Sequence, residues 1–113
     1  MIIIYHNPIC LNANRCIKIL ETNFKEDHEI KRESLELTEE KLKEILNLLK
    51  CKPIDIIRTN QEIWKTLFKF LSFSDDELIK IMLKFPILIK GPIVINGNKA
   101  IIGRPPELIL DIL

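Results

Sequence analysis

The apolar residues at the start of the chain predict a strand followed by a helix. Ile2–Tyr5 is a short, β-branched run, which is typical of a central strand buried on both faces. Residues 6–8 favour a turn, and a helical repeat begins at Cys10. The apolar members of this repeat are Ala13, Cys16, Ile17 and Leu20. A weaker second strand is expected around Ile30, so the chain begins as a strand–helix–strand unit with parallel strands.

Residues 38–85 have a helical pattern throughout. Helices are predicted after Thr38, near Asn60 and after Ser74, with a short helical turn between the first two. Ser74 and Glu77 have the spacing of a capping box, in which each side chain binds a free backbone amide of the other residue. The apolar stripes of the first two helices are Leu42, Ile45, Leu46, Leu49 and Trp64, Leu67, Phe68, Leu71. The short helical turn carries Ile54, Ile56 and Ile57, and the last helix of the block carries Leu78, Ile81, Met82 and Phe85. We interpret this block as an insertion into a smaller fold.

The C-terminal part predicts a hairpin and a last helix. Asn96-Gly97 lies between the β-branched runs Ile93–Ile95 and Ala100–Ile102, which is a strong hairpin signal. The segment 103–107 then leads into a helix whose apolar residues are Leu108, Ile109, Ile112 and Leu113. The order β-α-β, helical insertion, β-β-α predicts an α/β fold with a mixed four-stranded sheet. At 113 residues, we expect a single domain over 1–113.

Composition narrows the classes of partner and compartment. The formal net charge is +1, so no global field attracts nucleic acid. The N-terminus lacks the basic region of a signal peptide, and no apolar run is long enough to cross a bilayer. We therefore expect a cytoplasmic protein without a nucleic-acid or membrane partner. Its three cysteines form neither a disulfide framework nor a zinc motif, so each is either a buried apolar residue or a reactive thiol.

Cys10 lies where the first strand gives way to the first helix. The free amides and the dipole of a helix N-terminus favour a thiolate and can also hold an oxyanion. Asn12, Asn14 and Arg15 add donors and a cation in the first turns, and His6 is placed to hydrogen-bond or charge-stabilise the sulfur. Cysteine is a poor helix cap compared with Ser, Asp or Asn. We therefore interpret Cys10 as a nucleophile rather than as a cap.

The other two cysteines have different surroundings in the sequence. Cys16 belongs to the apolar face of the first helix and is expected in the core. It follows Cys10 by six residues, about 240° around a helix, which excludes a disulfide between them while the helix is intact. Cys51 lies between two lysines and is expected to be a surface or half-buried loop thiol. A role for Cys51 in resolving Cys10 stays open.

Four motifs in order resemble the glutaredoxin-coupled arsenate reductase family, which also contains Spx-type regulators and uncharacterised relatives. They are YHNPIC at 5–10, DIIRTN at 55–60, FPILIKGPIV at 85–94 and GRPPE at 103–107. The resemblance covers essentially the whole chain. It implies a thioredoxin-like fold with an inserted helical subdomain at about 38–85.

The resemblance also implies a reaction. Cys10 would attack arsenate, glutathione as co-substrate would attack the cysteinyl-arsenate adduct, and glutaredoxin would clear the mixed disulfide. Arg58 and Arg104 match arginines that hold the oxyanion, for which a planar guanidinium is suited. Pro92 matches a cis-proline beside the nucleophile, and His6 a histidine near the sulfur. The expected protein is a monomer with glutaredoxin and a small oxyanion as partners, and without a tightly bound cofactor or metal.

Two expected cations are missing or displaced. Gly91 stands where the family has a third arginine, with Lys90 one residue earlier, and successive residues near a strand point in opposite directions. Asn14 stands at a first-turn position that usually has arginine, with Arg15 displaced by about 100° around the helix. Asn14 is then the expected substrate-binding residue there. Each lost charge-assisted contact is worth roughly 1.5 to 3 kcal/mol, or about ten- to a hundredfold in oxyanion affinity.

Two alternative functions follow from these departures. The weakened cation set at Gly91 and Asn14 favours a glutathione-dependent thiol-disulfide reductase of another substrate. The family also includes Spx-like redox-sensing transcription partners, which carry a Cys-x-x-Cys pair. Here the second position of such a pair is Ala13, so that dithiol switch is absent.

Overall fold

The computed structural model describes residues 2–6, 11–23 and 30–113. The chain divides into two compact units. We call them the sheet unit, which runs up to Leu35 and again from Gly91 to Leu113, and the helical unit, Glu36–Lys90. The helical unit contains the predicted insertion, and the organisation of 1–113 as a single domain stays a prediction.

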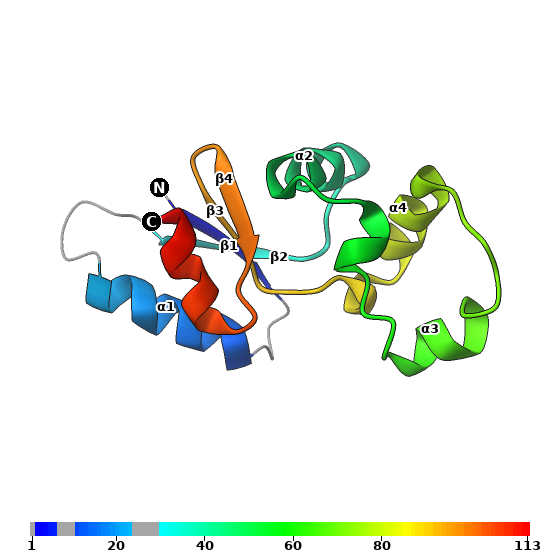
Figure 1. Ribbon diagram of the computed structural model, residues 1–113, viewed down its shortest axis with the longest axis horizontal. Helices are drawn as coiled ribbons and strands as arrows, with labels where there is room; N and C mark the ends of the chain where they lie inside the picture. Colours follow the sequence, from blue (N-terminus) through cyan, green and yellow to red (C-terminus); the bar gives the residue numbers. More distant parts are fainter. Residues whose placement is uncertain (1, 7–10, 24–29) are drawn as a thin grey trace. The chain divides into compact units, whose positions relative to one another are not determined.

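The sheet unit contains a mixed four-stranded sheet, as predicted (Figure 1). Its strands are β1 (Ile2–His6), β2 (Ile30–Ser34), β3 (Ile93–Asn96) and β4 (Lys99–Ile102). Their order across the sheet is β2-β1-β3-β4; β1 is parallel to β2 and antiparallel to β3. The helix α1 (Leu11–Asn23) connects the parallel pair. β1 continues to His6, one residue beyond the predicted run, because His6 pairs with Ser34 in the ladder.

One face of the sheet carries the core of this unit. The short helix η3 (Pro106–Ile112) contacts both α1 and β4, and Figure 1 shows it beside α1. All four predicted core positions of α1 are buried. The cluster consists of Ile2, Ile4, Cys16, Ile17, Leu20, Val94, Ile109 and Ile112. Complete burial of one such aliphatic side chain contributes about 1.5 to 3 kcal/mol, so the cluster fixes α1 and η3 on the sheet.

The predicted hairpin is present, with its turn one residue later than expected. Asn96 is the last residue of β3 and pairs with Lys99, which leaves Gly97 and Asn98 as the loop. Gly97 has a positive φ of 64° at the first loop position, where type II′ turns have glycine. Asn96 belongs to the strand rather than to the turn. Its side-chain Nδ2 donates a hydrogen bond to the Ile112 carbonyl at 2.8 Å, which holds it there.

The last helix is a 3-10 helix rather than an α-helix. Its buried residues Pro106, Ile109 and Ile112 recur every third position, which is the 3-10 repeat. Of the apolar residues of this predicted helix, Ile109 and Ile112 are buried, whereas Leu108 and Leu113 are each 36% exposed.

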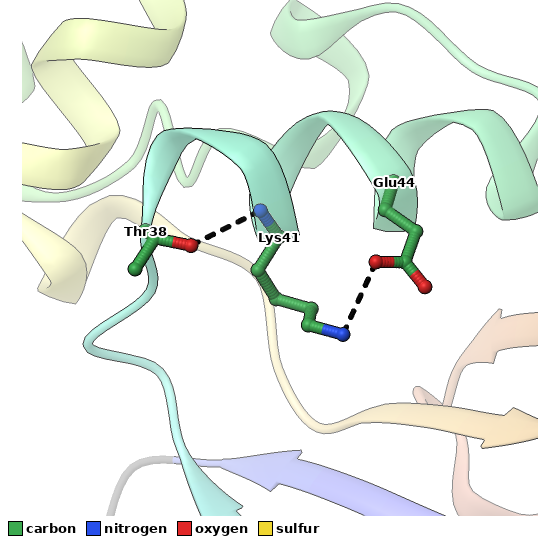
Figure 2. A network of polar contacts seen from close by, with 3 residues as sticks. All are labelled: Thr38, Lys41 and Glu44. Carbon is green, nitrogen blue, oxygen red and sulfur yellow. Dashed lines mark hydrogen bonds and ion pairs between the residues drawn. The ribbon is translucent and has the colours of Figure 1, made fainter.

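The helical unit contains three α-helices and two 3-10 turns. They are α2 (Glu39–Leu49), η1 (Pro53–Ile56), α3 (Glu62–Leu67), α4 (Asp75–Lys84) and η2 (Pro86–Leu88). Thr38 caps α2, because its hydroxyl accepts a hydrogen bond from the Lys41 backbone amide at 3.2 Å (Figure 2). In the same turn Lys41 Nζ lies 3.1 Å from Glu44 Oε2. At α4 the predicted capping box of Ser74 and Glu77 is confirmed.

The helix predicted near Asn60 is shorter than expected. α3 has six residues, and of its predicted apolar stripe only Trp64 is buried. Leu67 and Leu71 are 51% and 61% exposed. A helix of fewer than two turns cannot carry a continuous apolar face; instead Trp64 packs in a cluster of rings with Phe68, Phe73 and Phe85. Elsewhere in this unit Ile79, rather than Ile81, is buried, and Ile54 is exposed.

Candidate functional site

Cys10, the predicted nucleophile, lies outside the described residues. Two described elements border it in the sequence: β1, which ends at the half-buried His6, and α1, which begins at Leu11. The other predicted site residues are described, and those of the sheet unit lie at the end of β1, on α1 and on the segments around β3 and β4.

Arg104 and Pro92 lie together in the sheet unit. The Gly91–Pro92 peptide bond is cis, the geometry that the resemblance implies. Arg104 Nε donates a hydrogen bond to the Gly91 carbonyl, and the Gly103 amide donates one to the Pro92 carbonyl at 2.9 Å. These two bonds join the segment before β3 to the turn after β4. They also orient the guanidinium of Arg104, whose terminal amino groups have no partner among the described residues and suit an oxyanion.

The turn that carries Arg104 is packed against the buried thiol of Cys16. Cys16 is fully buried, as predicted, and its Sγ lies 3.8 Å from the Gly103 carbonyl and 4.0 Å from that of Pro106. A Cβ on Gly103 would lie 2.6 Å from Cys16 Sγ and 3.3 Å from Pro92 Cγ. The turn can approach α1 this closely only because position 103 has no side chain. Cys16 therefore supports the residue that precedes Arg104.

Asn14 binds a cation that the sequence did not point to. Its side chain is exposed on the first turns of α1, and its Oδ1 accepts a hydrogen bond from Arg32 Nη2 at 3.4 Å. Arg32 comes from β2, opposite Ile4 of β1 in the parallel ladder. A charged residue in a weakly patterned strand carries no local signal of such a contact. Arg32 thus supplies a guanidinium beside the position at which the family has arginine.

Arg58 lies in the helical unit and is half-buried. Its backbone amide donates a hydrogen bond to the Leu88 carbonyl at 2.7 Å, and the preceding Ile57 forms an antiparallel bridge with Ile89. The backbone that carries Arg58 is thereby fixed against the end of the helical unit. Arg104, Pro92 and Asn14 belong to the other unit.

Lys90 does not take the place of the arginine that the family has at position 91. Lys90 Nζ donates a hydrogen bond to the Asp55 backbone carbonyl at 3.0 Å, which directs this ammonium into the helical unit. A Cβ on Gly91 would lie 3.0 Å from Leu35 Cδ1. A larger residue at position 91 would therefore require the buried Leu35 side chain to move.

Cys51 is a half-buried loop thiol, as predicted. Burial raises the pKa of this thiol, the charge of Asp55 raises it further, and the charge of Lys90 lowers it. Cys51 lines an open cavity of about 620 Å³ with Leu46, Asn47, Lys50, Lys52 and Asp55. A raised pKa disfavours the thiolate, which is the reactive form.

Within residues 2–6, 11–23 and 30–113, no three His, Cys, Asp or Glu side chains are grouped so that they could hold a metal ion. No helix in this part of the chain has the length and apolar character needed to cross a membrane.

Comparisons with known proteins agree with the fold and the motifs. The model of the ArsC family matches residues 5–112. An arsenate reductase of Haemophilus influenzae is 38% identical over 120 residues, covering 99% of this chain and 98% of the relative. The uncharacterised protein YfgD of Escherichia coli is 31% identical, covering 97% and 94%. The solved structure of an arsenate reductase from Vibrio cholerae superimposes with a TM-score of 0.84 at 32% identity, covering 99% and 97%.

These matches extend over almost the full length of both partners. They confirm the α/β, thioredoxin-like fold and the family resemblance that the four motifs indicated. The chain belongs to the ArsC family.

Proposed function

We propose that this protein is a thiol-dependent arsenate reductase that uses Cys10 as nucleophile and glutathione and glutaredoxin as reductants. One observation carries the proposal: Arg104 is fixed through Nε on the Gly91 carbonyl beside Pro92, so that its terminal amino groups can bind an oxyanion. The support from similarity is the 38% identity to the arsenate reductase of Haemophilus influenzae.

The proposed reaction balances in three steps. The Cys10 thiolate attacks As(V), an S–As bond forms and water leaves. A glutathione thiolate then attacks the Cys10 sulfur; an S–S bond forms, the S–As bond breaks, and its electron pair leaves with the arsenic as arsenite. Glutaredoxin and a second glutathione reduce the mixed disulfide. One arsenate and two glutathione molecules thus give one arsenite, one glutathione disulfide and one water.

Each predicted site residue has a role in this scheme. Arg104 and Arg58 hold the arsenate oxygens and favour the Cys10 thiolate, because opposite charges stabilise the ionised form. Asn14, with Arg32 on its Oδ1, adds polar contact at the first turns of α1. Pro92 lines the site. His6, four residues before the nucleophile in the sequence, stabilises the sulfur.

The proposal also covers the co-substrate, the oligomeric state, the compartment and the domain organisation. Glutathione acts as a co-substrate, and the protein needs no tightly bound cofactor. The protein acts as a monomer in the cytoplasm, where thiols are kept reduced. Residues 1–113 form one domain with a helical insertion.

A coupled assay tests the proposal. Protein supplied with arsenate, glutathione, glutaredoxin and glutathione reductase is expected to oxidise NADPH, and Cys10→Ser is expected to abolish this activity. Cys51→Ser is the matched control and keeps it. Arg104→Lys keeps the charge but loses the planar fork, so we expect the KM for arsenate to rise about ten- to a hundredfold. Equal turnover by Cys10→Ser and the unmodified protein would exclude the proposed nucleophile.

A second candidate is favoured by the surroundings of Gly91. Leu35 occupies the space next to position 91, and Lys90 is directed to Asp55. A glutathione-dependent reductase of a small disulfide needs fewer oxyanion contacts. The double variant Gly91→Arg/Leu35→Ala distinguishes the two, with Leu35→Ala as control. A strong rise in arsenate turnover supports the oxyanion substrate; unchanged arsenate turnover, with rapid reduction of a mixed disulfide, supports the second candidate.

A further inference from the structure

An open groove between α1 and η3 is not used by the reaction described above. Its volume is about 390 Å³, and it is lined by Arg15, Lys18, Ile19, Thr22 and Glu107. Four of these residues come from α1 and one from η3, so the groove lies entirely within the sheet unit. Its volume is within the range of sites that bind small molecules.

The groove has two cations, one carboxylate and an apolar part. Arg15 and Lys18 are exposed and lie one turn apart on α1, and the exposed Glu107 belongs to η3. Ile19 between them is partly buried against the core cluster. The complementary ligand is a small, elongated molecule with two carboxylates, one ammonium and a short aliphatic middle. Glutathione, a tripeptide thiol, has these groups.

The groove also leads toward the N-terminal end of α1. At 100° per residue, positions 11, 15, 18 and 22 lie within about 60° of one another around α1. The groove therefore follows the helix face that reaches the first residue, Leu11, which Cys10 directly precedes in the sequence. Lys18 lies about 10 Å along the axis from Leu11, and a fully extended tripeptide spans about 10 Å. A tripeptide anchored at Lys18 can thus reach the N-terminal end of the helix.

We propose that this groove is the binding site for glutathione. Arg15 and Lys18 bind its carboxylates and Glu107 its ammonium, while its thiol lies toward the start of α1. This inference rests on the proposed function, since it names where the co-substrate of that reaction binds.

Binding can be measured without turnover. The probe is S-methylglutathione, whose sulfur cannot react, titrated into isotope-labelled protein and followed by NMR. We expect the shifted amide signals to belong to residues 15–22 and to Glu107. Arg15→Gln and Lys18→Gln are each expected to weaken binding by up to about fivefold, the usual range for an exposed ion pair. Lys99→Gln, an exposed lysine of β4 outside the groove, is the matched control.

The pairing of Glu107 with the ligand's ammonium is tested with a second ligand that lacks this group. Glu107→Gln is expected to weaken binding of S-methylglutathione but not of its N-acetyl derivative, which lacks the ammonium. Equal weakening of both ligands would contradict the assigned pairing. Amide signals that shift at Gly91 and Arg104 instead of the groove, or no shifts at millimolar probe, would overturn the site.

Steady-state kinetics of Lys18→Gln distinguish a failure of the glutathione site from a failure of the proposed function. Lys18→Gln is expected to raise the KM for glutathione while the KM for arsenate stays constant. If the groove binds the probe but no arsenate is reduced, the reductase proposal fails and the site stands. If arsenate is reduced and Lys18→Gln leaves the KM for glutathione unchanged, the site fails and the reductase proposal stands.

Discussion

The turn between β4 and η3 depends on one residue without a side chain. Gly103 lies so close to Cys16 that an added Cβ would be 2.6 Å from the sulfur. The core cluster holds Cys16 in place, and the hydrogen bond from the Gly103 amide to the Pro92 carbonyl holds Gly103 in place. Neither can yield without moving a helix or the turn that carries Arg104.

Gly103→Ala is therefore expected to cost about 1 to 3 kcal/mol in the free energy of unfolding, as overpacked cores do. Because the turn moves, the KM for arsenate should rise as well. Urea unfolding and the coupled assay measure the two effects. The double variant Gly103→Ala/Cys16→Ala removes the clash and should recover part of both losses relative to Gly103→Ala. Strictly additive losses would show that the two residues do not interact.

The Cys51 thiol is expected to react slowly at neutral pH. Burial and Asp55 raise its pKa, so the thiolate appears only at higher pH than for a free cysteine. Alkylation of Cys51, followed by mass spectrometry in Cys10→Ser protein, measures this pH dependence. Asp55→Asn should shift the alkylation profile to lower pH, and Lys90→Gln should shift it to higher pH. Profiles that coincide with that of a free thiol would contradict the raised pKa.

Single residues were predictable from the sequence where the signal is local. The burial of Cys16 followed from its place on an apolar helix face, and the half-buried Cys51 from its loop between lysines. The contacts of Arg32 with Asn14 and of Cys16 with Gly103 join residues 18 and 87 positions apart. Such contacts depend on strand order and helix placement, which no local pattern contains.

At the scale of elements, α4 owes its start to a capping box. The Ser74 hydroxyl accepts a hydrogen bond from the Glu77 amide at 3.2 Å, and Glu77 Oε1 accepts one from the Ser74 amide at 3.0 Å. The first of these bonds requires no charge, whereas the second is strengthened by the ionised carboxylate. Ser74 and Glu77 therefore affect stability differently as the pH changes.

Ser74→Ala is expected to lower the free energy of unfolding by about 1 kcal/mol, the usual cost of losing a cap. The hydrogen bonds from Ser74, the backbone bond first, lower the pKa of Glu77 from its ordinary value of 4.5. A lowered pKa stabilises the fold above pH 4.5, and this contribution is lost as the pH falls through the folded pKa.

Glu77→Gln removes that pH dependence and keeps a hydrogen-bond acceptor. Urea unfolding at neutral and acidic pH should therefore show the unmodified protein losing more stability on acidification than Glu77→Gln. Glu62→Gln, at an exposed first-turn carboxylate of α3 outside the box, is the control. The same loss in Glu77→Gln as in the unmodified protein would exclude a role for the Glu77 charge.

The elements whose ends are set by turn or capping residues were predicted well, and the short helices α3 and η3 were not. The hairpin and the α4 cap follow from turn and capping residues that act within four positions. The limits of α3 did not, because Leu67 and Leu71 have the spacing of an apolar face, yet the helix ends at Leu67. In η3 the buried residues are three apart, a spacing that α- and 3-10 helices share.

For the whole molecule, the single-domain organisation can be tested by unfolding. The sheet unit is built from both ends of the chain, so it cannot form until the helical unit between them has been synthesised. We expect one cooperative transition, with fluorescence of Trp64 in the helical unit and circular dichroism of the whole chain changing together. Two separate transitions would show that the units unfold independently.

The position of β2 at the end of the order β2-β1-β3-β4 has a consequence for behaviour in solution. An edge strand offers backbone groups to any other extended chain, which is a route to aggregation. β2 has the sequence IKRES, with Lys31, Arg32 and Glu33 in succession. A second copy pairing in parallel register would bring equal charges face to face at each of these residues. The guanidinium that Arg32 extends to Asn14 thus also helps to keep the protein dispersed at high concentration.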